Sequence, residues 1–578
     1  MKKMLYSLSL LILFTLSYCS NSDSQTVLSK HNVNYTKRYN LDFNNFQDSV
    51  TTWRKFFCRS NTKIDTSIIY NGKHPFKIYP FKMNISNHLD YNVSQQILLP
   101  DAKFNTIEVC LTSKMKNITR AKLWIDHISE YEKIMFTDTV DINSTDAQWH
   151  TFSHTFSSKG VKYLGLRFFI SSKSEQEKMA WLDKIQIFLD KKPIDSFPLQ
   201  DAPLFALKES AGVVELSLEE NKYSLIPEFA NKKIMALGET THGSASINKV
   251  VTQIVRHQIE SNNCRLVLLE LPFELMLSVD KYVKGDTSFA GDSLIKSYRP
   301  YYDKEALDAL IHYITEYNIQ HVDDPVTLMG MDISLSMENT YEYLLHYVKC
   351  MNLKKKDIVL NDFCDILSYK STLNFSSEVL TYVENHPELK QLIPSSDYNA
   401  IVQSLKISEM MPPVFEIRAD FRDLVMKQNT TFLLNEYAPE DKRVIIYTHF
   451  NHANYGTINY SIVKPTMGTY MKDEYKEAYG CLGILLGNGN VLALTMEEPE
   501  CLRKIFSPKK NSMEFCFDVL PESFFYCPST DFEDMPSYIR LLGVPYMEKE
   551  QFYLINPKAR MDGAIFIKES EAVVLEKK

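Results

Sequence analysis

The C-terminal part of the chain alternates short apolar runs with segments of helical periodicity. An apolar run at residues 234–237 is followed by apolar side chains at positions 247, 250, 251, 254, 255 and 259, which fits 3.6 residues per turn. Further continuous runs lie at residues 266–269, 326–330 and 444–447. Strands buried on both faces read as continuous apolar runs, and a helix between two of them makes a βαβ unit. The pattern therefore predicts an α/β fold with a mainly parallel sheet and helices on both faces.

The segment between the last two runs has a different pattern. From about residue 340 to 436, Leu, Ile and Val recur at mixed i, i+3 and i+4 spacing, which is typical of amphipathic helices. We therefore predict a helical insertion there, inside an α/β domain that covers residues 205–572.

Residues 41–195 show neither long helical periods nor continuous apolar runs. Strand-like segments separated by polar turns lie at residues 106–112, 122–128, 150–156, 163–170 and 180–189. Regular short strands of this kind predict a smaller antiparallel β-sandwich. The pattern of residues 181–188, after the strand at 149–152, resembles jelly-roll modules of the carbohydrate-binding type. Trp124, Trp149 and Trp181 could stack on a sugar ring, or they could fill the sandwich core.

The amino terminus predicts export. Lys2 and Lys3 precede an apolar run at residues 5–16, which is too short for a membrane span and is typical of a signal peptide over residues 1–18. The sequence Leu-Ser-Tyr-Cys ending at Cys19 resembles a bacterial lipoprotein cleavage site, which implies lipidation of Cys19, with residues 19–40 as a tether. A plain cleaved signal peptide is the alternative. The expected location is the bacterial cell envelope, and the expected membrane contact is the lipid anchor alone.

Charge and composition narrow the range of partners. The 578 residues carry a formal net charge of −8 that is spread along the chain, without a basic face that could neutralise a phosphate backbone. Nucleic acid is therefore not an expected partner. The chain contains neither GxGxxG nor GxxxxGK[ST], so common nucleotide chemistry has no support. The ten cysteines include no CxxC pair, which favours mostly unpaired thiols after Cys19.

Titratable residues follow each of the four continuous apolar runs. These residues are Glu239, Glu270, Asp332 and His449. The carboxyl ends of parallel strands share one edge of a sheet, and ligand sites form outside that edge. The sequence therefore predicts that these four side chains meet at one site, where Asp332 would help to bind the substrate.

Three further groups belong to this predicted site. His242 lies in the turn Gly-Glu-Thr-Thr-His-Gly at residues 238–243, ahead of a helix whose dipole would keep the imidazole neutral and able to act as a general base. His452 follows His449 at a spacing of three residues. Arg299, in Tyr-Arg-Pro-Tyr-Tyr, could bind a carboxylate or an oxyanion, and a surface ion pair is the alternative.

The order of these motifs resembles the erythromycin esterase family. The motifs are Gly-Glu-x-Thr-His-Gly at 238–243, an apolar strand ending at Glu270, Gly-Met-Asp at 330–332, Arg-Asp-x-x-Met at 422–426, His-x-x-His at 449–452 and the closing segment at 561–567. The resemblance implies a hydrolase that opens an ester or a lactone without a cofactor. It implies that His242 is the general base, that Glu239 assists it, that Glu270 is a site acid, and that His449 or His452 polarises the carbonyl or protonates the leaving alcohol. Phe450 departs from the family, which often has an asparagine there.

Two alternatives stay open at the level of sequence. His242, His449, His452 and a carboxylate could bind a divalent metal such as zinc and activate its water. Alternatively, the chain could be a non-catalytic envelope lipoprotein that uses the fold to bind a ligand, with carbohydrate bound by the N-terminal domain. The expected partner under the enzyme hypothesis is a small-molecule ester or lactone.

Overall fold

The computed structural model describes most of residues 34–574. It leaves out residues 45–52, 57–59, 81–88, 131–133, 143–145, 173–175, 201, 203, 210, 219–221, 290–303, 335–336, 369–374, 411–418, 439, 457–464, 494–500, 506 and 543–551. The predicted signal peptide, the candidate lipidation site Cys19 and the candidate substrate-binding residue Arg299 all lie outside the described residues.

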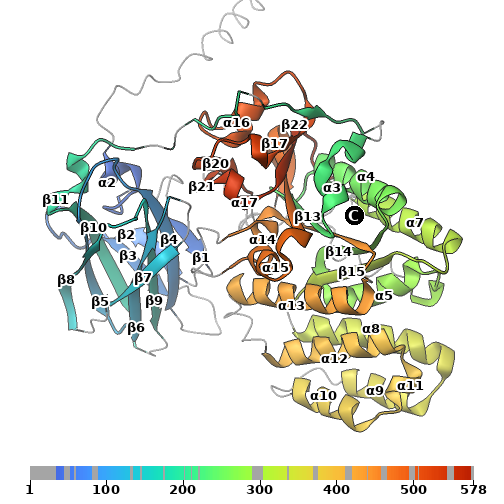
Figure 1. Ribbon diagram of the computed structural model, residues 1–578. Coiled ribbons are helices and arrows are strands. Elements are labelled where there is room, and N and C mark those ends of the chain that lie inside the picture. The colour runs from blue at the N-terminus through green and yellow to red at the C-terminus, as the bar shows by residue number, and fades with distance from the viewer. Residues whose placement is uncertain are drawn as a thin grey trace, which may run out of the picture.

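Two antiparallel sheets pack face to face in the N-terminal part of the chain (Figure 1). One sheet has the order β1 (Arg54–Phe56), β4 (Leu89–Leu98), β9 (Tyr163–Ser172), β6 (Arg120–Ile128), β7 (Ile134–Asp141). The other has the order β2 (Ser60–Ile64), β3 (Phe76–Pro80), β10 (Met179–Leu189), β5 (Thr106–Lys116), β8 (Asp146–Ser157), and β11 (Lys192–Pro193) pairs with β10. Alternate residues of the strands point inward and form one apolar core between the sheets. We call this region the sandwich.

The tryptophans of the sandwich already have partners within it. Trp181 is 4% exposed, and two lysine ammonium groups lie 5.3 and 5.4 Å from its ring. The guanidinium of Arg167 lies 5.0 Å from the ring of Trp124, and Trp149 stacks on Tyr70 at 4.0 Å. Sugar stacking on these rings stays a prediction.

A larger sheet forms the core of the C-terminal part. Its order is β12 (Val214–Glu215), β19 (Phe524–Pro528), β22 (Gly563–Ser570), β17 (Tyr479–Ala493), β13 (Ile234–Glu239), β16 (Arg443–His449), β14 (Cys264–Pro272), β15 (Thr327–Asp332), and β18 (Cys501–Ile505) pairs with β17. The strands from β22 to β15 are parallel to one another. The strands β19, β12 and β18 pair antiparallel. The sheet is therefore mixed: the run from β22 to the edge strand β15 is parallel, as predicted, and β19, β12 and β18 are antiparallel.

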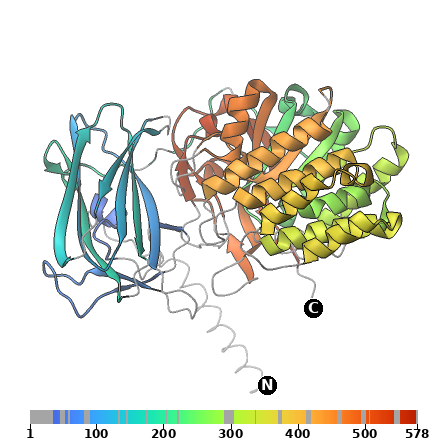
Figure 2. The ribbon, with the colours of Figure 1, turned by 90° about the horizontal axis from the view of Figure 1, so that it is seen from below.

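Helices cover both faces of this sheet. Successive strand residues alternate between two apolar clusters, with Leu237 and Leu269 facing α4 (Ala245–Ser261) and α7 (Lys304–Gln320), and Ala236 and Leu268 facing the other side. That other side is covered by α13 (Ala419–Tyr437), α14 (Phe450–Ala453), α15 (Met467–Tyr475) and α16 (Met513–Asp518). The α5 helix (Phe273–Val283) contributes to both clusters. Seen from below, the orange and yellow helices lie across one face of the domain (Figure 2).

The segment predicted as an insertion is helical. It contains α8 (Met337–Lys355), α9 (Ile358–Ser368), α10 (Phe375–Asn385), α11 (Leu389–Leu392), α12 (Ser395–Met410) and α13. The remaining helical segments are α2 (Tyr35–Arg38), α3 (Pro227–Asn231), α17 (Pro557–Arg560) and the 3₁₀ turns η1 (Ile194–Ser196), η2 (Lys222–Leu225), η3 (Thr287–Phe289), η5 (Lys476–Ala478) and η6 (Ser529–Asp531). Within the ranges that the structure describes, no helix is both long and apolar enough to span a bilayer.

A hairpin of the C-terminal part touches the sandwich. Its strands β20 (Ser537–Arg540) and β21 (Phe552–Ile555) pair antiparallel, and Leu554 packs against Leu98, Ile128 and Tyr163.

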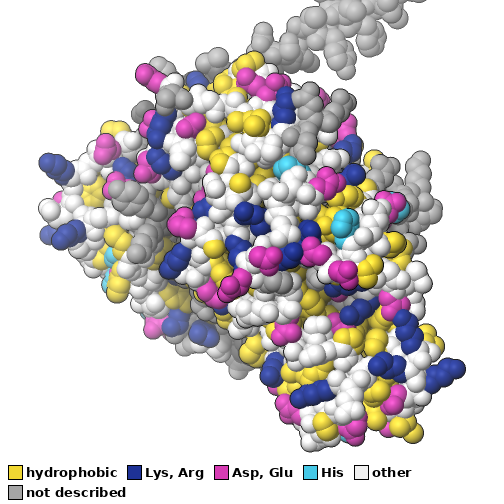
Figure 3. All heavy atoms as spheres, turned by 45° about the vertical axis from the view of Figure 1, so that its right-hand side comes forward, with side chains coloured by type: hydrophobic (Ala, Val, Ile, Leu, Met, Phe, Trp, Pro, Cys, Tyr) yellow, Lys and Arg dark blue, Asp and Glu magenta, His cyan; other side chains and the backbone are white. Residues whose placement is uncertain are grey.

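On the face shown in Figure 3, acidic and basic side chains are interspersed, in keeping with the spread of charge along the sequence.

Candidate active site

Strands β13, β16, β14 and β15 are consecutive neighbours in the sheet, so their carboxyl ends lie side by side. The last residue of β13, Glu239, is in register with His449, the last residue of β16. The other two predicted carboxylates, Glu270 and Asp332, lie in β14 and at the end of β15. The structure therefore brings these four predicted residues to one edge, as expected for parallel strands.

Glu239 and His242 form a hydrogen-bonded pair on the side of the sheet that faces α4. Nδ1 of His242 lies 2.7 Å from Oε1 of Glu239, whose side chain is 1% exposed. The Tyr447 hydroxyl donates to Oε2 of Glu239 at 2.5 Å, and Asn248 donates to the Tyr447 oxygen at 2.8 Å. Because the carboxylate accepts from Nδ1–H, the neutral imidazole carries its lone pair on Nε2.

The pKa of His242 differs from the expectation based on the helix dipole. Burial alone lowers the pKa of His242, but the hydrogen bond and charge of Glu239, together with the charge of Glu270, outweigh burial and raise it above the ordinary 6.5. Burial also raises the pKa of Glu239, against the opposing effects of His242 and Tyr447. The expectation that the start of α4 lowers the pKa of His242 is therefore wrong, because a carboxylate 2.7 Å from Nδ1 raises it.

Glu270 lies on the other side of the sheet and accepts several donors. Arg422 of α13 donates from Nη2 to Oε1 at 2.7 Å. The Thr448 hydroxyl and the His449 backbone N–H both donate to Oε2 at 2.7 Å. Burial by itself would raise the pKa of Glu270, but the charges of His452 and Arg422 hold it well below its usual range. Glu270 is therefore an ionised carboxylate in the site.

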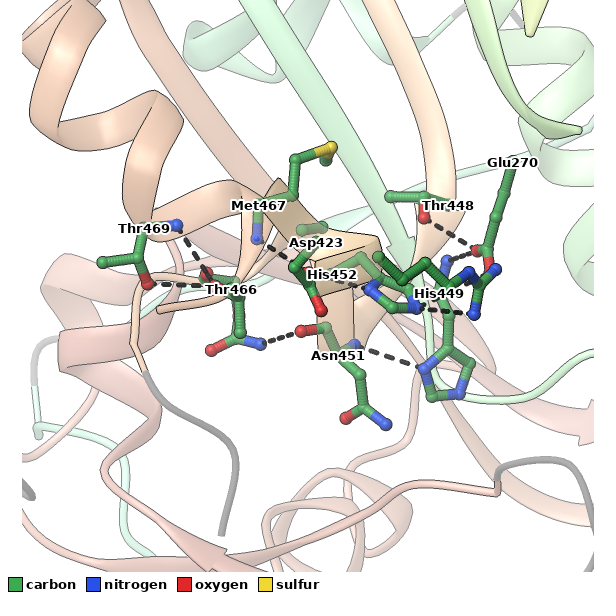
Figure 4. A network of polar contacts seen from close by, with 12 residues as sticks. Glu270, Asp423, Thr448, His449, Asn451, His452, Thr466, Met467 and Thr469 are labelled. Carbon is green, nitrogen blue, oxygen red and sulfur yellow. Dashed lines mark hydrogen bonds and ion pairs between the residues drawn. The ribbon is translucent and has the colours of Figure 1, made fainter. Parts of the chain in front are cut away.

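A second histidine–carboxylate pair lies beside Glu270 (Figure 4). Nδ1 of His452 lies 2.9 Å from Oδ1 of Asp423, which also accepts the Met467 backbone N–H at 2.8 Å. Nε2 of His452 lies 3.7 Å from Oε1 of Glu270 and 3.4 Å from Nη1 of Arg422. Burial alone would lower the pKa of His452, but the charges of Asp423 and Glu270 raise it.

Both ring nitrogens of His449 form hydrogen bonds within the protein. Nδ1 accepts the backbone N–H of Asn451 at 3.2 Å and so caps α14. The proton is therefore on Nε2, which lies 3.2 Å from the Leu542 carbonyl oxygen and donates to it. Burial lowers the pKa of His449 to about 3, and the charge of His242, 5.0 Å away between ring centroids, acts in the same direction. His449 is consequently neutral at physiological pH.

Sequence reasoning assigned no site role to Arg422 or Asp423, although both stand in the Arg-Asp-x-x-Met motif. Arg422 also donates to both oxygens of Asp332, at 2.9 and 2.6 Å. Asp332 therefore holds the guanidinium, and the predicted contact of Asp332 with a substrate stays a prediction. The signal for Arg422 and Asp423 in the sequence is their place in the Arg-Asp-x-x-Met motif.

Two glycines and a phenylalanine shape the turn that carries His242. A Cβ on Gly238 would lie 2.9 Å from the ring of Phe450, which is buried against this strand. Gly243 has a φ of +78°, and a Cβ there would clash with the carbonyl oxygen of Leu492. Both positions require glycine for close approach. Phe450 belongs to the apolar core and not to the polar site.

Neither a metal-binding cluster nor a disulfide is found among the described residues. Within those ranges no group of three or more His, Cys, Asp or Glu side chains is arranged to hold a metal ion. Free thiols within the described ranges are Cys110, Cys264, Cys350, Cys364, Cys481, Cys516 and Cys527.

Comparison with known proteins gives one family match. Residues 259–359 and 407–570 match the family model described as Erythromycin esterase. These ranges include Glu270, Arg422 and both later histidines, while Glu239 and His242 precede them.

Individual relatives are distant. "Putative hydrolase YbfO" from Bacillus subtilis (strain 168) is 22% identical over 319 residues, which are 48% of this chain and 69% of that protein. A solved structure of a succinoglycan biosynthesis protein covers 63% of this chain and 96% of its own, with a TM-score of 0.50 and 14% identity. A mutant of the erythromycin esterase EreC in its open conformation covers 62% and 96%, with a TM-score of 0.42 and 14% identity.

Proposed function

Because the α/β domain of this chain belongs to the erythromycin esterase family, we propose that the protein is a hydrolase that opens an ester or a lactone. The observation that carries the proposal is the His242–Glu239 pair at 2.7 Å, beside an ionised Glu270 and the guanidinium of Arg422. This set offers a base, a carboxylate that orients it, and a fixed positive charge. The name of the relative from Bacillus subtilis supports a hydrolase as well.

In the proposed reaction, His242 activates water. Nε2 of His242 accepts a proton from water, and the water oxygen forms a bond to the carbonyl carbon while the C=O π pair moves onto oxygen. The tetrahedral intermediate collapses when the bond to the alcohol oxygen breaks, and that oxygen takes the proton from His242. The products are an alcohol and a carboxylic acid, or a hydroxy acid when the substrate is a lactone. Glu239 stabilises the imidazolium that exists between the two proton transfers.

Arg422 is the proposed electrostatic partner of the intermediate. Its side chain is 29% exposed, although its guanidinium binds Glu270 and Asp332, so Arg422 borders the space proposed for the substrate. A cation fixed by two carboxylates does not have to reorganise when negative charge develops on the carbonyl oxygen. We propose for Arg422 the same kind of role that the sequence predicts for Arg299, and the prediction for Arg299 stays untested.

The test is a search for hydrolysis by the full-length protein. A pooled panel of macrolactones and simple acyl and sugar esters is incubated with the protein and with His242→Asn, and masses are compared. We expect one member of the panel to gain the mass of one water with the parent protein, and the gain to disappear with the variant. Hydrolysis that persists in well-folded His242→Asn would contradict the assignment of the base.

A single turnover in ¹⁸O-labelled water then tests how water attacks. Direct attack puts the label into the product acid in the first turnover. If Glu270 attacked instead, it would displace the alcohol and form a mixed anhydride; attack of water on the Glu270 carbonyl of that anhydride would put the label in a Glu270 peptide and an unlabelled enzyme oxygen in the product. We expect label in the product and none in the peptide.

The proposed setting of this activity follows from the sequence. The predicted signal peptide and lipidated Cys19 would place the enzyme in the cell envelope. A divalent metal is not part of the proposed reaction.

Carbohydrate binding by the sandwich is the second hypothesis, and loss of retention on polysaccharides after Trp149→Ala would support it.

A further inference from the structure

Strand β16 ends with two consecutive residues that contact the two carboxylates of the site. Tyr447 belongs to the apolar cluster on the α4 side, and its hydroxyl donates to Oε2 of Glu239 at 2.5 Å. The next residue, Thr448, points to the opposite face, and its hydroxyl donates to Oε2 of Glu270 at 2.7 Å. Because β16 lies between β13 and β14, one strand gives a hydroxyl donor to the carboxylate on each side.

We propose that Tyr447 is a positioning residue that keeps Glu239 ionised and aimed at His242, and that Thr448 has the corresponding role for Glu270. The part of this proposal that concerns catalysis rests on the proposed hydrolase function. The part that concerns ionisation does not, because it describes the protein without a substrate.

The direction of the Tyr447 hydrogen bond is fixed by its other neighbour. Asn248 of α4 donates its amide hydrogen to the Tyr447 oxygen at 2.8 Å, so the phenol hydrogen is directed toward the carboxylate. Tyr447 is 3% exposed and Asn248 is 4% exposed. The result is a buried hydrogen-bonded chain in which Asn248 donates to Tyr447, and Tyr447 and His242 both donate to Glu239.

Glu239 depends on this donor because it is 1% exposed. A buried carboxylate stays ionised only when donors or positive charges compensate for the lost water. The groups that face Glu239 are His242 on the following turn, Tyr447 on β16 and Glu270 on β14, and the first two favour its ionised form. Removing the Tyr447 hydroxyl leaves His242 as the remaining favourable group of these three.

Glu270 accepts more hydrogen bonds than Glu239 does. The two parts of the proposal therefore predict effects of different size. It accepts from Arg422, from Thr448 and from the backbone N–H of His449. The charged and titratable groups around it are Arg422, His452, His242 and His449. We therefore expect the loss of the Thr448 hydroxyl to have a smaller effect on Glu270 than the loss of the Tyr447 hydroxyl has on Glu239.

The decisive experiment measures the titration of His242 in full-length Tyr447→Phe. Diethyl pyrocarbonate acylates the neutral imidazole, so the pH dependence of labelling at His242, quantified by peptide mass spectrometry, reports its pKa without a substrate. Without the phenol donor, Glu239 takes up a proton more readily, and a neutral Glu239 no longer stabilises the imidazolium of His242. We expect the pKa of His242 to fall by about one unit, the size expected for a hydrogen bond to a charged group.

Tyr526→Phe is the matched control. The Tyr526 hydroxyl donates to Glu228 at 2.5 Å, and Tyr526 is a buried tyrosine on β19 of the same sheet, so the variant removes the same kind of hydrogen bond away from the site. We expect an unchanged His242 titration. An unchanged titration in Tyr447→Phe, or an equal shift in Tyr526→Phe, would overturn the proposal.

A second variant covers a folding failure of Tyr447→Phe. Asn248→Ala keeps the tyrosine and removes the donor that directs it, and we expect a smaller fall in the pKa of His242. If Asn248→Ala left the titration unchanged, the proposal would fail. Once a hydrolysed ester is found, the acid limb of the kcat/KM profile follows the same shift. A shifted titration in a protein that hydrolyses no ester would reject the proposed function and keep this inference.

Discussion

The site contains two histidine–carboxylate pairs with similar contacts and different surroundings. Nδ1 of His242 lies 2.7 Å from Glu239, and Nδ1 of His452 lies 2.9 Å from Asp423. The second ring nitrogen of His452 lies 3.4 Å from the guanidinium of Arg422. The carboxylates differ as well, because Glu239 is held by a side chain of the sheet whereas Asp423 also binds a backbone N–H at the start of α15.

This difference shows that a histidine–carboxylate contact does not by itself identify a general base. Neutral His452 donates from Nδ1 to Asp423 and accepts from Arg422 on Nε2, so these contacts, between α13, α14 and the sheet beside Glu270, fix the position of the guanidinium. His242 is 19% exposed, against 12% for His452, and it lies in the turn that follows β13. We therefore assign proton transfer to His242 and the positioning of Arg422 to His452.

Exchanging each histidine for asparagine gives the largest expected contrast. Asparagine keeps a polar group near the position of Nδ1 and removes Nε2. We expect His242→Asn to lower kcat/KM by about 10³-fold, within the ~10²–10⁴-fold typical of general base catalysis. His452→Asn removes a contact that orders Arg422, and we expect a loss of roughly tenfold, as for a positioning contact. Steady-state kinetics on the ester found in the panel measures both, and a larger loss in His452→Asn would reverse the assignment.

Arg422 gives the next largest effect because it contacts His452 and Glu270, and its charge also acts on His242. Arg422→Ala removes the proposed electrostatic partner of the intermediate, and we expect kcat to fall by about 10²-fold with a smaller change in KM. The substitution also leaves Glu270 and Asp332 buried without their cation, so thermal unfolding is expected at a lower temperature. Arg422→Lys keeps the charge without the planar fork and is expected to recover stability more than kcat. A change confined to KM would mean that Arg422 binds the substrate only.

The local parts of this site could be predicted from the sequence. Continuous apolar runs identified β13, β14, β15 and β16, and the rule for parallel strands placed Glu239, Glu270 and His449 at one edge. His242 was identified because it lies three residues from Glu239 in the same turn. These predictions depend on short spacings and on one property of parallel sheets.

The remaining parts depend on contacts between distant segments. Arg422 meets Glu270 across 152 positions of sequence, and the face of α13 that carries it is set by packing that periodicity does not show. The capping role of His449 and its bond to Leu542 likewise follow from tertiary structure. The central strand β17 was missed because its sequence is rich in glycine, and the antiparallel edge was missed because pairing direction is a long-range property.

The pH dependence of kcat/KM gives the smallest effect and separates the two pairs most directly. Because Glu239 and Glu270 raise the pKa of His242, we expect activity to fall with decreasing pH from a point above the ordinary 6.5. Glu239→Gln removes a negative charge beside the base, so the pKa of His242 falls and the acid limb moves to lower pH by roughly one unit. The matched control is Asp423→Asn, which removes the charge beside His452 and is expected to leave the acid limb in place. If Asp423→Asn moved the acid limb and Glu239→Gln did not, His452 would be the base, and His242 would have another role toward the substrate.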